Sequence, residues 1–332
     1  MVSAVKNLNR LICCFSLSAI LCCLFCGCAR TEAKTEQTFL LDTIVSVTYY
    51  KNADREAVLE ALSLCREYEL IFSRTDFRSE LYRLNESGSM EVSDTLCTVL
   101  KTALAYCDTS GGAFDVTMGG VSALYGFSDP DPRVPAPDDL AEALHHVGYE
   151  NVHIDGNTVT LGDPGAVLDL GAVAKGYIAD EMKALLAGRG VKHAIISLGG
   201  NVLTLGGKPD GSDYVIGIQY PEKDSARLVT AVNVSELSVV TSGVYERFFV
   251  ENGVEYHHIL DRSTGQPLRN GLIAVSVVGP ESMDCDALST ACFALGLEDG
   301  LALIEKLDGY EAVFITDDLS LHRSSGFAAL EK

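Results

Sequence analysis

The residues best suited to chemistry in this sequence lie between Asp284 and Gly296, in the stretch D-C-D-A-L-S-T-A-C-F-A-L-G. Apolar residues recur there at helical spacing, which predicts a helix with one buried face. Asp286 precedes Ser289 and Thr290 by three and four residues, so a carboxylate and two hydroxyls lie one turn apart. Oxygen ligands suit a hard cation such as Mg²⁺ better than zinc or copper. The structural alternative is that the aspartates only stabilise the helix N-terminus.

A second candidate segment runs from Leu168 to Asp180 and reads L-D-L-G-A-V-A-K-G-Y-I-A-D. It predicts a strand end, a glycine and then a helix that carries Lys175. The free N–H groups and the dipole of a helix start favour anions, and Lys175 would add a positive charge there. The spacing is neither that of a P-loop nor that of a G-x-G-x-x-G dinucleotide motif. The alternative is a lysine that is solvated on the helix surface.

Two shorter segments combine glycine with polar groups. Gly112–Asp115 reads G-A-F-D, where glycine lets the backbone approach a ligand closely. The alternative there is a turn whose aspartate is satisfied within the chain. Tyr256–Pro267 reads Y-H-H-I-L-D-R-S-T-G-Q-P and gathers two histidines, an aspartate and a Thr-Gly turn. Histidine is the natural proton-transfer group near neutral pH, although a lone histidine is more often structural.

Composition limits the partners that these segments can serve. The chain has 332 residues, enough for one large domain or two ordinary ones, and 47% of them are hydrophobic, which is ample for a core. Its 46 acidic and 25 basic residues give a net charge of -21, which argues against binding to a nucleic-acid backbone. An anionic cofactor would need local basic residues or a bound metal to be held.

The N-terminus predicts export. Lys6 and Arg10 precede an uncharged apolar run, Leu11–Phe25, in the pattern of a secretory signal over residues 1–28. The end of this leader, F-C-G-C, resembles a bacterial lipobox in which Cys28 becomes the lipidated first residue of the mature chain. An uncleaved membrane-spanning anchor is the alternative, because the uncharged run is long. Either way we expect a domain tethered to the outer face of the cytoplasmic membrane.

The remainder predicts a polar tether over residues 29–38 and one folded domain over residues 39–332. A β-branched strand at Phe39–Tyr50, a strand pair around Asp155-Gly156 and several helices indicate an α+β fold rather than a doubly wound sheet. One of these helices is predicted to begin at Ser93, a favourable N-cap residue. Five cysteines outside the leader are scattered without a C-x-x-C pair, so we expect no disulfide framework, and we expect the four other than Cys285 to be buried in helices. The five are Cys65, Cys97, Cys107, Cys285 and Cys292.

Six motifs in one order resemble those of the ApbE family, the FAD:protein FMN transferases. They are S-E-L-x-R-L-N at Ser79–Asn85, G-A-F-D at Gly112–Asp115, D-L-G-A-V-A-K-G at Asp169–Gly176, S-L-G-G-N at Ser197–Asn201, T-S-G-x-Y-E-R at Thr241–Arg247 and H-x-x-D-x-x-T-G at His258–Gly265. The D-A-L-S-T of Asp286–Thr290 resembles the terminal signature of the family. The resemblance spans residues 39–327 and implies one compact, two-lobed catalytic domain.

The resemblance also implies two sets of site residues. FAD would be held by Leu41, Ala113, Phe114, Asp115, Asp169, Lys175 and Leu260. Magnesium would be bound by the backbone carbonyl of Ala172 together with Asp286 and Thr290. The chain departs from the family pattern at Leu41 and Asp42, which replace Met-Gly, at Thr75, near which an aromatic residue is usual, and at Arg262, which replaces proline.

The implied reaction moves FMN from FAD to a threonine hydroxyl of an acceptor flavoprotein, such as a subunit of a membrane redox complex, and releases AMP. Mg²⁺ and Lys175 would neutralise the charge that builds on the pyrophosphate. His258 is the candidate for proton transfer or for orienting the phosphates, and Asp286 could also accept the proton. Two alternatives use the same site: a Mg²⁺-dependent FAD pyrophosphatase that yields FMN and AMP, and a non-catalytic FAD-binding lipoprotein. A tethered solute-binding module unrelated to flavin is a third.

Overall fold

The computed structural model describes residues 32–50, 53–220 and 227–332, so the expected leader at residues 1–28 lies outside the described residues. The chain divides into two units, Met1–Ala33 and Lys34–Lys332, and the architecture below is that of the second. Among the described residues, no helix has the length and apolar character needed to span a bilayer.

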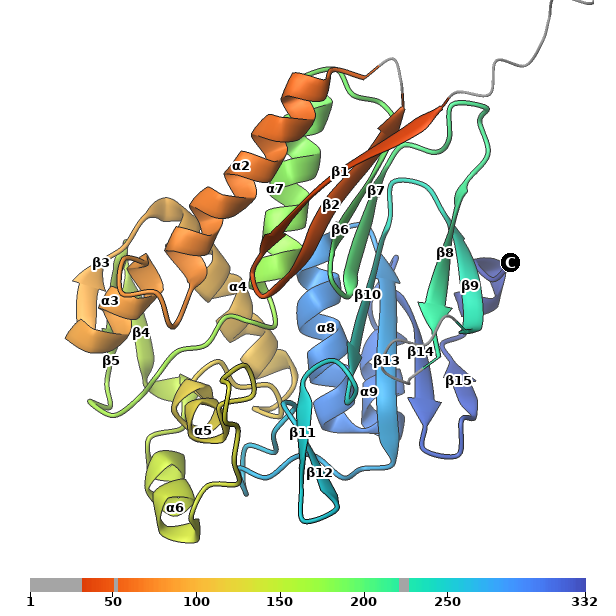
Figure 1. Cartoon of the computed structure of the whole chain (residues 1–332). Helices are drawn as coiled ribbons and strands as arrows, with labels where there is room; N and C mark the ends of the chain where they lie inside the picture. The colour runs from red at the N-terminus through yellow and green to blue at the C-terminus, as the bar shows by residue number, and fades with distance from the viewer. Residues whose placement is uncertain (1–31, 51–52, 221–226) are drawn as a thin grey trace, which may run out of the picture. The chain divides into compact units, whose positions relative to one another are not determined.

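An eight-stranded sheet forms the centre of this unit, with the strand order β1-β2-β6-β7-β10-β13-β14-β15 (Figure 1). Each pairing from β2 through to β15 is antiparallel. The α+β prediction is therefore confirmed. The strands are β1 (Ala33–Leu40), β2 (Thr43–Tyr50), β6 (Ala194–Leu198), β7 (Asn201–Leu205), β10 (Ser238–Gly243), β13 (Leu272–Gly279), β14 (Glu311–Thr316) and β15 (Leu321–Arg323).

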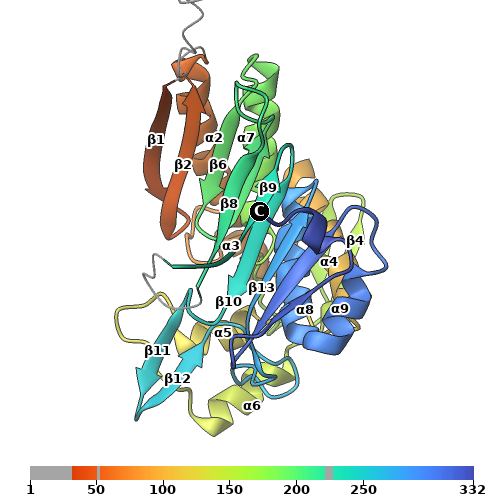
Figure 2. The ribbon, with the colours of Figure 1, turned by 90° about the vertical axis from the view of Figure 1, so that its right-hand side faces the viewer.

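Smaller elements surround the sheet. A three-stranded sheet in the order β3-β5-β4 contains the expected hairpin at Asp155-Gly156, and the β11–β12 hairpin lies beyond the end of β10 in both views (Figures 1 and 2). The β8–β9 hairpin is a separate two-stranded sheet. The strands are β3 (Ser89–Glu91), β4 (Val152–Asp155), β5 (Thr158–Leu161), β8 (Tyr214–Gln219), β9 (Leu228–Val234), β11 (Phe248–Glu251) and β12 (Val254–His257).

One segment that the sequence predicted as a tether is part of the sheet. β1 begins at Ala33, so the expected boundary at residue 39 falls inside a strand. The polar residues of β1 are mostly exposed, which suits an edge strand, and only Leu40 is buried. The turn to β2 places Leu41 and Asp42 at φ values of 54° and 57°, a left-handed conformation that is uncommon without glycine. A short polar edge strand is easily mistaken for a linker, because both consist of exposed polar residues.

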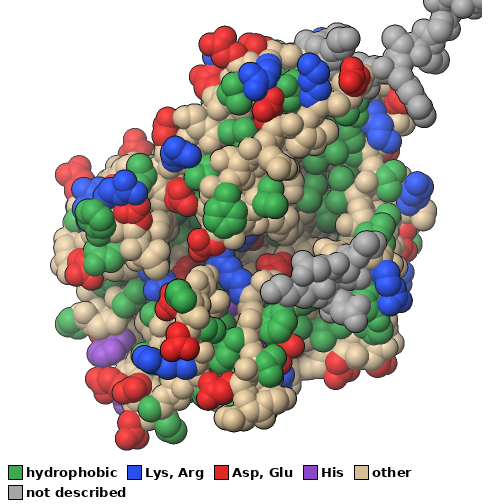
Figure 3. All heavy atoms as spheres, viewed as in Figure 1, with side chains coloured by type: hydrophobic (Ala, Val, Ile, Leu, Met, Phe, Trp, Pro, Cys, Tyr) green, Lys and Arg blue, Asp and Glu red, His purple; other side chains and the backbone are tan. Residues whose placement is uncertain are grey.

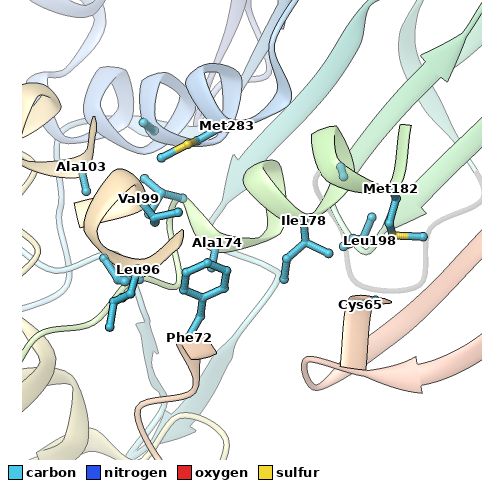
Figure 4. Packing of buried hydrophobic residues seen from close by; sticks show 14 of the residues in the cluster. Cys65, Phe72, Leu96, Val99, Ala103, Ala174, Ile178, Met182, Leu198 and Met283 are labelled. Carbon is cyan, nitrogen blue, oxygen red and sulfur yellow. The ribbon is translucent and has the colours of Figure 1, made fainter. Parts of the chain in front are cut away.

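Helices α7 (Ala174–Gly188) and α8 (Ser282–Leu295) pack on one face of the main sheet, α7 against β6 and β7 and α8 against β10 and β13. Figure 4 shows Ile178 and Met182 of α7 beside Leu198 of β6, and Met283 of α8 beside Val99 of α4. All five described cysteines are free, as expected, and all are buried, including Cys285. The remaining helices are α2 (Arg55–Phe72), α3 (Glu80–Ser87), α4 (Asp94–Thr109), α5 (Gly119–Tyr125), α6 (Pro137–His145) and α9 (Leu297–Ile304).

The N-termini of α7 and α8 cap each other. Neither helix has a side-chain cap of its own. Asp180 of α7 accepts hydrogen bonds from the Ser282 and Met283 N–H groups, each 2.9 Å long. In return, Oδ2 of Asp286 on α8 accepts from the Gly176 N–H at 3.0 Å. Each carboxylate thus satisfies N–H groups that the partner helix cannot satisfy internally.

The close approach of these helices depends on Gly176. A Cβ atom at this position would lie 2.4 Å from the Ser282 carbonyl oxygen and 2.5 Å from the Met283 Cα. Both neighbours are backbone atoms in a packed core, so they cannot move aside without shifting a helix. The glycine therefore sets the spacing that brings Asp286 to the start of α7.

We expect Gly176→Ala to lower the free energy of unfolding by about 1–3 kcal/mol, because the added methyl group overpacks this contact. Gly188→Ala is the matched control on the same helix, since a Cβ there has no atom within 4 Å, and it should be neutral or slightly stabilising. Urea unfolding of both variants measures the difference. Equal stability of the two variants would contradict the proposed helix spacing.

Candidate active site

Asp286 and Lys175 come together although they are far apart in the sequence. The predicted helix at Asp284 is confirmed as part of α8, and Asp286 is only 2% exposed within it. Its Oδ1 lies 3.8 Å from the Lys175 ammonium, which also donates to the Gly171 carbonyl at 3.1 Å. Lys175 is therefore not the solvated lysine of the structural alternative. It links the N-terminal loop of α7 to the buried carboxylate of α8.

The loop that leads into α7 differs from the prediction. The residues before Gly171 form a loop instead of the expected strand end, and an isolated β-bridge joins Val167 to Met118. The Asn85 side chain holds this loop, because it donates to the Leu168 carbonyl at 3.0 Å and accepts from the Leu168 N–H at 2.9 Å. Backbone hydrogen bonds join the same loop to the 116–119 segment, from the Asp169 N–H to the Val116 carbonyl at 2.8 Å and from the Gly119 N–H to the Val167 carbonyl at 3.0 Å, so the asparagine amide adds to a short backbone pairing.

Hydroxyl groups continue the site along α8. Thr290 Oγ1 lies 3.0 Å from Ser242 Oγ, and Ser289 Oγ lies 2.7 Å from the same atom. Ser289 is fully buried and donates to the Asp286 carbonyl at 2.9 Å. Thr290 is only partly buried. Of the two hydroxyls, Thr290 is therefore the one that remains open to a ligand beside Asp286.

The expected cation ligands, the Ala172 carbonyl, Asp286 and Thr290, all coordinate through oxygen. Ala172 is partly buried and lies one residue after Gly171, whose carbonyl receives the Lys175 ammonium. Asp286 and the Ala172 loop are thereby neighbours. Within the described residues, no group of three or more His, Cys, Asp or Glu side chains could hold a metal. A carboxylate, a hydroxyl and a backbone carbonyl are nonetheless a donor set that fits a hard cation.

Two aspartates predicted to contact FAD have different surroundings. Asp169 is partly exposed, with Oδ2 3.1 Å from Arg74 Nε and Oδ1 accepting from the Gly171 N–H at 2.9 Å. The Asp115 side chain is 0% exposed, and its Oδ2 lies 2.8 Å from Arg262 Nε. Its oxygens also accept from the backbone N–H groups of Thr117 and Tyr149. Asp115 therefore holds its loop from within, as the structural alternative proposed, and its carboxylate does not face a ligand.

Arg262 occupies a central position in this part of the structure. It pairs with Glu150 at 2.7 Å as well as with Asp115, and its guanidinium lies over the Tyr149 ring. A cavity of about 530 Å³ adjoins it. The cavity is lined by Gly111, Gly112, Ala113, Val147, Asp261, Arg262, Ser263, Leu268 and Ala294. The G-A-F-D loop thus faces a recess beside the H-x-x-D-x-x-T-G loop, as a ligand-binding role requires.

His258 has one ring nitrogen available. Its Nδ1 lies 3.2 Å from the Arg247 carbonyl oxygen, which can only accept, so Nδ1 carries the proton and Nε2 is left as an acceptor. Burial, with a further contribution from the Arg247 charge, lowers the pKa of His258 to about 3. Burial likewise lowers the pKa of His257 to about 4. His257 is 1% exposed and donates from Nε2 to the Leu268 carbonyl, so it is structural.

Sequence reasoning assigned no role to Glu246 or Arg247, the two charged residues of the T-S-G-x-Y-E-R motif. Glu246 is exposed as a whole residue. Desolvation of its carboxyl group by the surrounding protein, together with the negative charge of Asp286, raises its pKa to about 7. The charges of Lys175 and Arg247 act in the opposite direction. A Cβ on Gly200 would lie 2.9 Å from Glu246 Oε1, so glycine admits this side chain. The adjacent acid and base in the motif were the available signal.

Leu41 and Leu260, the remaining predicted FAD contacts, lie on two separate segments. Leu41 is partly buried, and its N–H donates to Glu69 Oε1 at 2.9 Å. Thr43, the first residue of β2, packs against Gly199. Leu260 is partly buried and forms a β-bridge with Pro267. Figure 3 shows acidic and basic side chains gathered in a hollow near the middle of one face of the molecule.

Known proteins resemble this chain over most of its length. The sequence model of the ApbE family matches residues 41–314. The FAD:protein FMN transferase of Treponema pallidum (strain Nichols) is 35% identical, over 92% of both chains. That of Klebsiella pneumoniae (strain 342) is 33% identical over 82% of this chain and 86% of its own.

The chain belongs to the ApbE family.

Solved structures agree with this assignment. The ApbE protein of Thermotoga maritima superposes with a TM-score of 0.84 at 31% identity, covering 91% of this chain and all (100%) of its own. The flavin transferase ApbE of Vibrio cholerae gives a TM-score of 0.81 at 29% identity, over 90% and 99%. The single α+β domain expected from the ApbE motifs is therefore confirmed.

One ApbE motif supports the site from a distance. In S-E-L-x-R-L-N, Asn85 holds the Leu168 backbone as described, and the Glu80 carboxylate accepts from the N–H and hydroxyl of Ser93 at 2.7 and 2.6 Å. Ser93 in turn caps α4 by accepting from the Leu96 N–H at 3.2 Å, which confirms the predicted N-cap. This motif fixes two elements and places no side chain beside Asp286.

The lowered pKa of His257 predicts a loss of stability in acid. The unfolded chain, with a histidine pKa of about 6.5, binds more protons than the folded chain between that pH and the folded pKa. The stabilisation is therefore complete above pH 6.5 and is lost as the pH falls towards 4. We expect wild type to lose about 1–2 kcal/mol more than His257→Gln between pH 7 and pH 5. Urea unfolding at both pH values measures this, and parallel losses would refute it.

Proposed function

We propose that this protein transfers FMN from FAD to a threonine hydroxyl of an acceptor flavoprotein, with formation of a phosphoester and release of AMP. The observation that carries the proposal is the Lys175–Asp286 pair at the start of α7, within an ApbE fold. Relatives at 35% and 33% identity bear the name FAD:protein FMN transferase. The dipole at the start of α7 and the Lys175 ammonium suit the pyrophosphate of FAD.

We also propose that the site works with Mg²⁺. Asp286, Thr290 and the Ala172 carbonyl would hold the cation, because they are oxygen donors on α8 and on the loop that leads into α7, and these two helices pack together. Supporting this, Asp286 Oδ1 makes an ion-pair contact with the Lys175 ammonium at 3.8 Å and accepts no hydrogen bond from the described residues, whereas Oδ2 is bonded to the Gly176 N–H. A bound cation would neutralise charge on the phosphate oxygens.

The proposed reaction balances without a nucleophile from this chain. The acceptor hydroxyl oxygen forms a bond to the FMN phosphorus, the bond from that phosphorus to the bridging oxygen breaks, and AMP leaves with the electron pair. The hydroxyl proton would pass to Nε2 of His258, which is unprotonated because Nδ1–H is bonded to the Arg247 carbonyl. The pyrophosphate anion bound nearby would offset the Lys175 and Arg247 charges that lower the His258 pKa, and would thereby make the ring a stronger base. Asp286 suits this role less, since it is buried and one of its oxygens is already bonded.

FAD would extend from the α7 start towards the 530 Å³ cavity beside the G-A-F-D loop. We propose contacts from Leu41, Ala113, Phe114, Asp169 and Leu260, in addition to Lys175. Asp115 would contribute through its backbone, since its carboxylate is occupied by Arg262.

The Asp286→Asn variant tests this function. Incubated with FAD, Mg²⁺ and an acceptor domain, wild type should increase the acceptor mass by one FMN, and the variant should be slower by about 100-fold or more, because a charge-stabilising group is lost. Mass spectrometry of the acceptor measures both rates.

Asp284→Asn is the matched control for that experiment. It changes the same side chain on the same helix, but Asp284 accepts from the Tyr310 hydroxyl at 2.7 Å rather than facing Lys175, so transfer should persist. AMP and FMN released by wild type without any acceptor would favour a pyrophosphatase. Intact FAD after long incubation with Mg²⁺ and the acceptor would favour a binding protein and refute the transferase.

We propose that the domain works outside the cytoplasm, anchored through a lipid on Cys28, where it would meet acceptor subunits of membrane redox complexes. The support is the charged start, the apolar run and the lipobox-like end of residues 1–28.

This localisation predicts that Cys28 is acylated. In bacteria grown with an alkyne-tagged palmitate, wild type should incorporate the label and sediment with membranes, whereas Cys28→Ser should do neither. Cys26→Ser is the control, since it removes a thiol two residues away and should keep the label. Membrane retention of unlabelled Cys28→Ser would indicate an uncleaved anchor instead.

A further inference from the structure

Asn201 is a buried polar side chain that has no explanation in the fold. It is 1% exposed at the start of β7, and neither its Nδ2 nor its Oδ1 has a hydrogen-bond partner in the described part of the chain. Burying an amide without partners costs its full desolvation penalty, so buried amides are nearly always hydrogen-bonded. A leucine of similar volume would fit the core without that penalty. The presence of asparagine therefore points to a ligand that the amide serves.

The register of the sheet shows which way Asn201 points. Asn201 lies opposite Val240 on β10 and opposite Leu198 on β6. Directly paired residues of antiparallel strands share a face. Val240 belongs to the core cluster of Leu288 on α8, and Leu198 packs beside Ile178 of α7 (Figure 4). The Asn201 amide is consequently directed into the layer between the sheet and these two helices.

Two hydrogen bonds between β10 and α8 show which residue of α8 lies beside Asn201. Ser238 Oγ donates to Ser282 Oγ at 2.9 Å, and Ser242 Oγ lies 3.0 Å from Thr290 Oγ1. Ser238 and Ser242 flank Val240 by two residues on either side and share its face. Asp286 lies four residues from both Ser282 and Thr290, one helical turn each way.

Asp286 is therefore level with Val240, and Asn201 is the neighbour of Val240 on the β7 side. α7 also packs against β7 and donates the Gly176 N–H to Asp286. The unpartnered amide thus lies on the sheet side of the Asp286 carboxylate, where α7 and α8 meet. The next residue back, Gly200, borders Glu246.

We propose that Asn201 is a positioning residue of the cation site, with its carboxamide bonded to a water ligand of the cation held by Asp286. The inference rests on the proposed function for its cation. Side chains in the outer coordination sphere of a metal orient its inner ligands, and their removal commonly weakens metal binding 10–100-fold. The amide accordingly serves the loaded site and leaves a stability penalty in the folded chain.

The test is Asn201→Leu, read by two quantities that should move in opposite directions. Mn²⁺, followed by electron paramagnetic resonance in the absence and presence of FAD, reports the cation site independently of turnover. We expect the variant to bind Mn²⁺ about 10–100-fold more weakly than wild type. Without metal, its free energy of unfolding should equal or exceed that of wild type, because a buried unsatisfied amide is removed.

Thr204→Val is the matched control on the same strand. Thr204 is 0% exposed but points to the other face of the sheet and donates to the Leu237 carbonyl at 2.9 Å. It should lose stability and keep its Mn²⁺ affinity.

Three outcomes would overturn the inference, and they can be told apart. Unchanged Mn²⁺ affinity in Asn201→Leu would refute the role of Asn201 alone. A fall in Mn²⁺ affinity together with a fall in stability would make Asn201 an ordinary structural residue. Wild type that binds no Mn²⁺, with or without FAD, would remove the cation site itself, while FMN transfer to the acceptor would still be measurable.

Discussion

The close contact between α7 and α8 is the constraint on which the site depends. Gly176 lets the backbone of one helix start touch the backbone of the other, and the carboxylates of Asp180 and Asp286 exchange N–H partners across that contact. Asp286 is thus held at a fixed place by a bond to the same helix that carries Lys175. Catalytic groups need placement to within a fraction of an ångström, and helix-to-helix packing supplies it more firmly than a loop.

Local charge explains how a strongly acidic chain can serve an anionic substrate. The net charge of -21 would repel a dinucleotide at long range. Around the Asp286 site, however, Lys175 and Arg247 oppose Glu246 and Asp286, and His258 stays neutral. A bound cation would tip that balance to positive. Affinity for phosphate would therefore be a property of this site rather than of the whole surface.

Sequence reasoning succeeded where the signal was local. Helical spacing predicted the helix of Asp286, and Ser93 was found as an N-cap because caps have a residue preference of their own. It failed for β1, whose polar edge strand resembles a linker, and for the loop before Gly171, which is held by the Asn85 side chain and by two backbone bonds to the 116–119 segment. The inward orientation of Asp115 and the unpaired amide of Asn201 depend on contacts between distant segments. No pattern within a single segment contains that information.

The pairing of Asp115 with Arg262 has a consequence for exchange between relatives. The resemblance to the family leads one to expect proline at residue 262, yet here a guanidinium reaches a carboxylate that has no exposure to water. In this chain the two positions are energetically linked, since removal of the arginine would leave a buried carboxylate without its counter-charge. A loop transplanted from a proline-bearing homologue would have to bring a replacement donor with it. Divergence at one such position is thus conditional on a second, more than a hundred residues away in the chain.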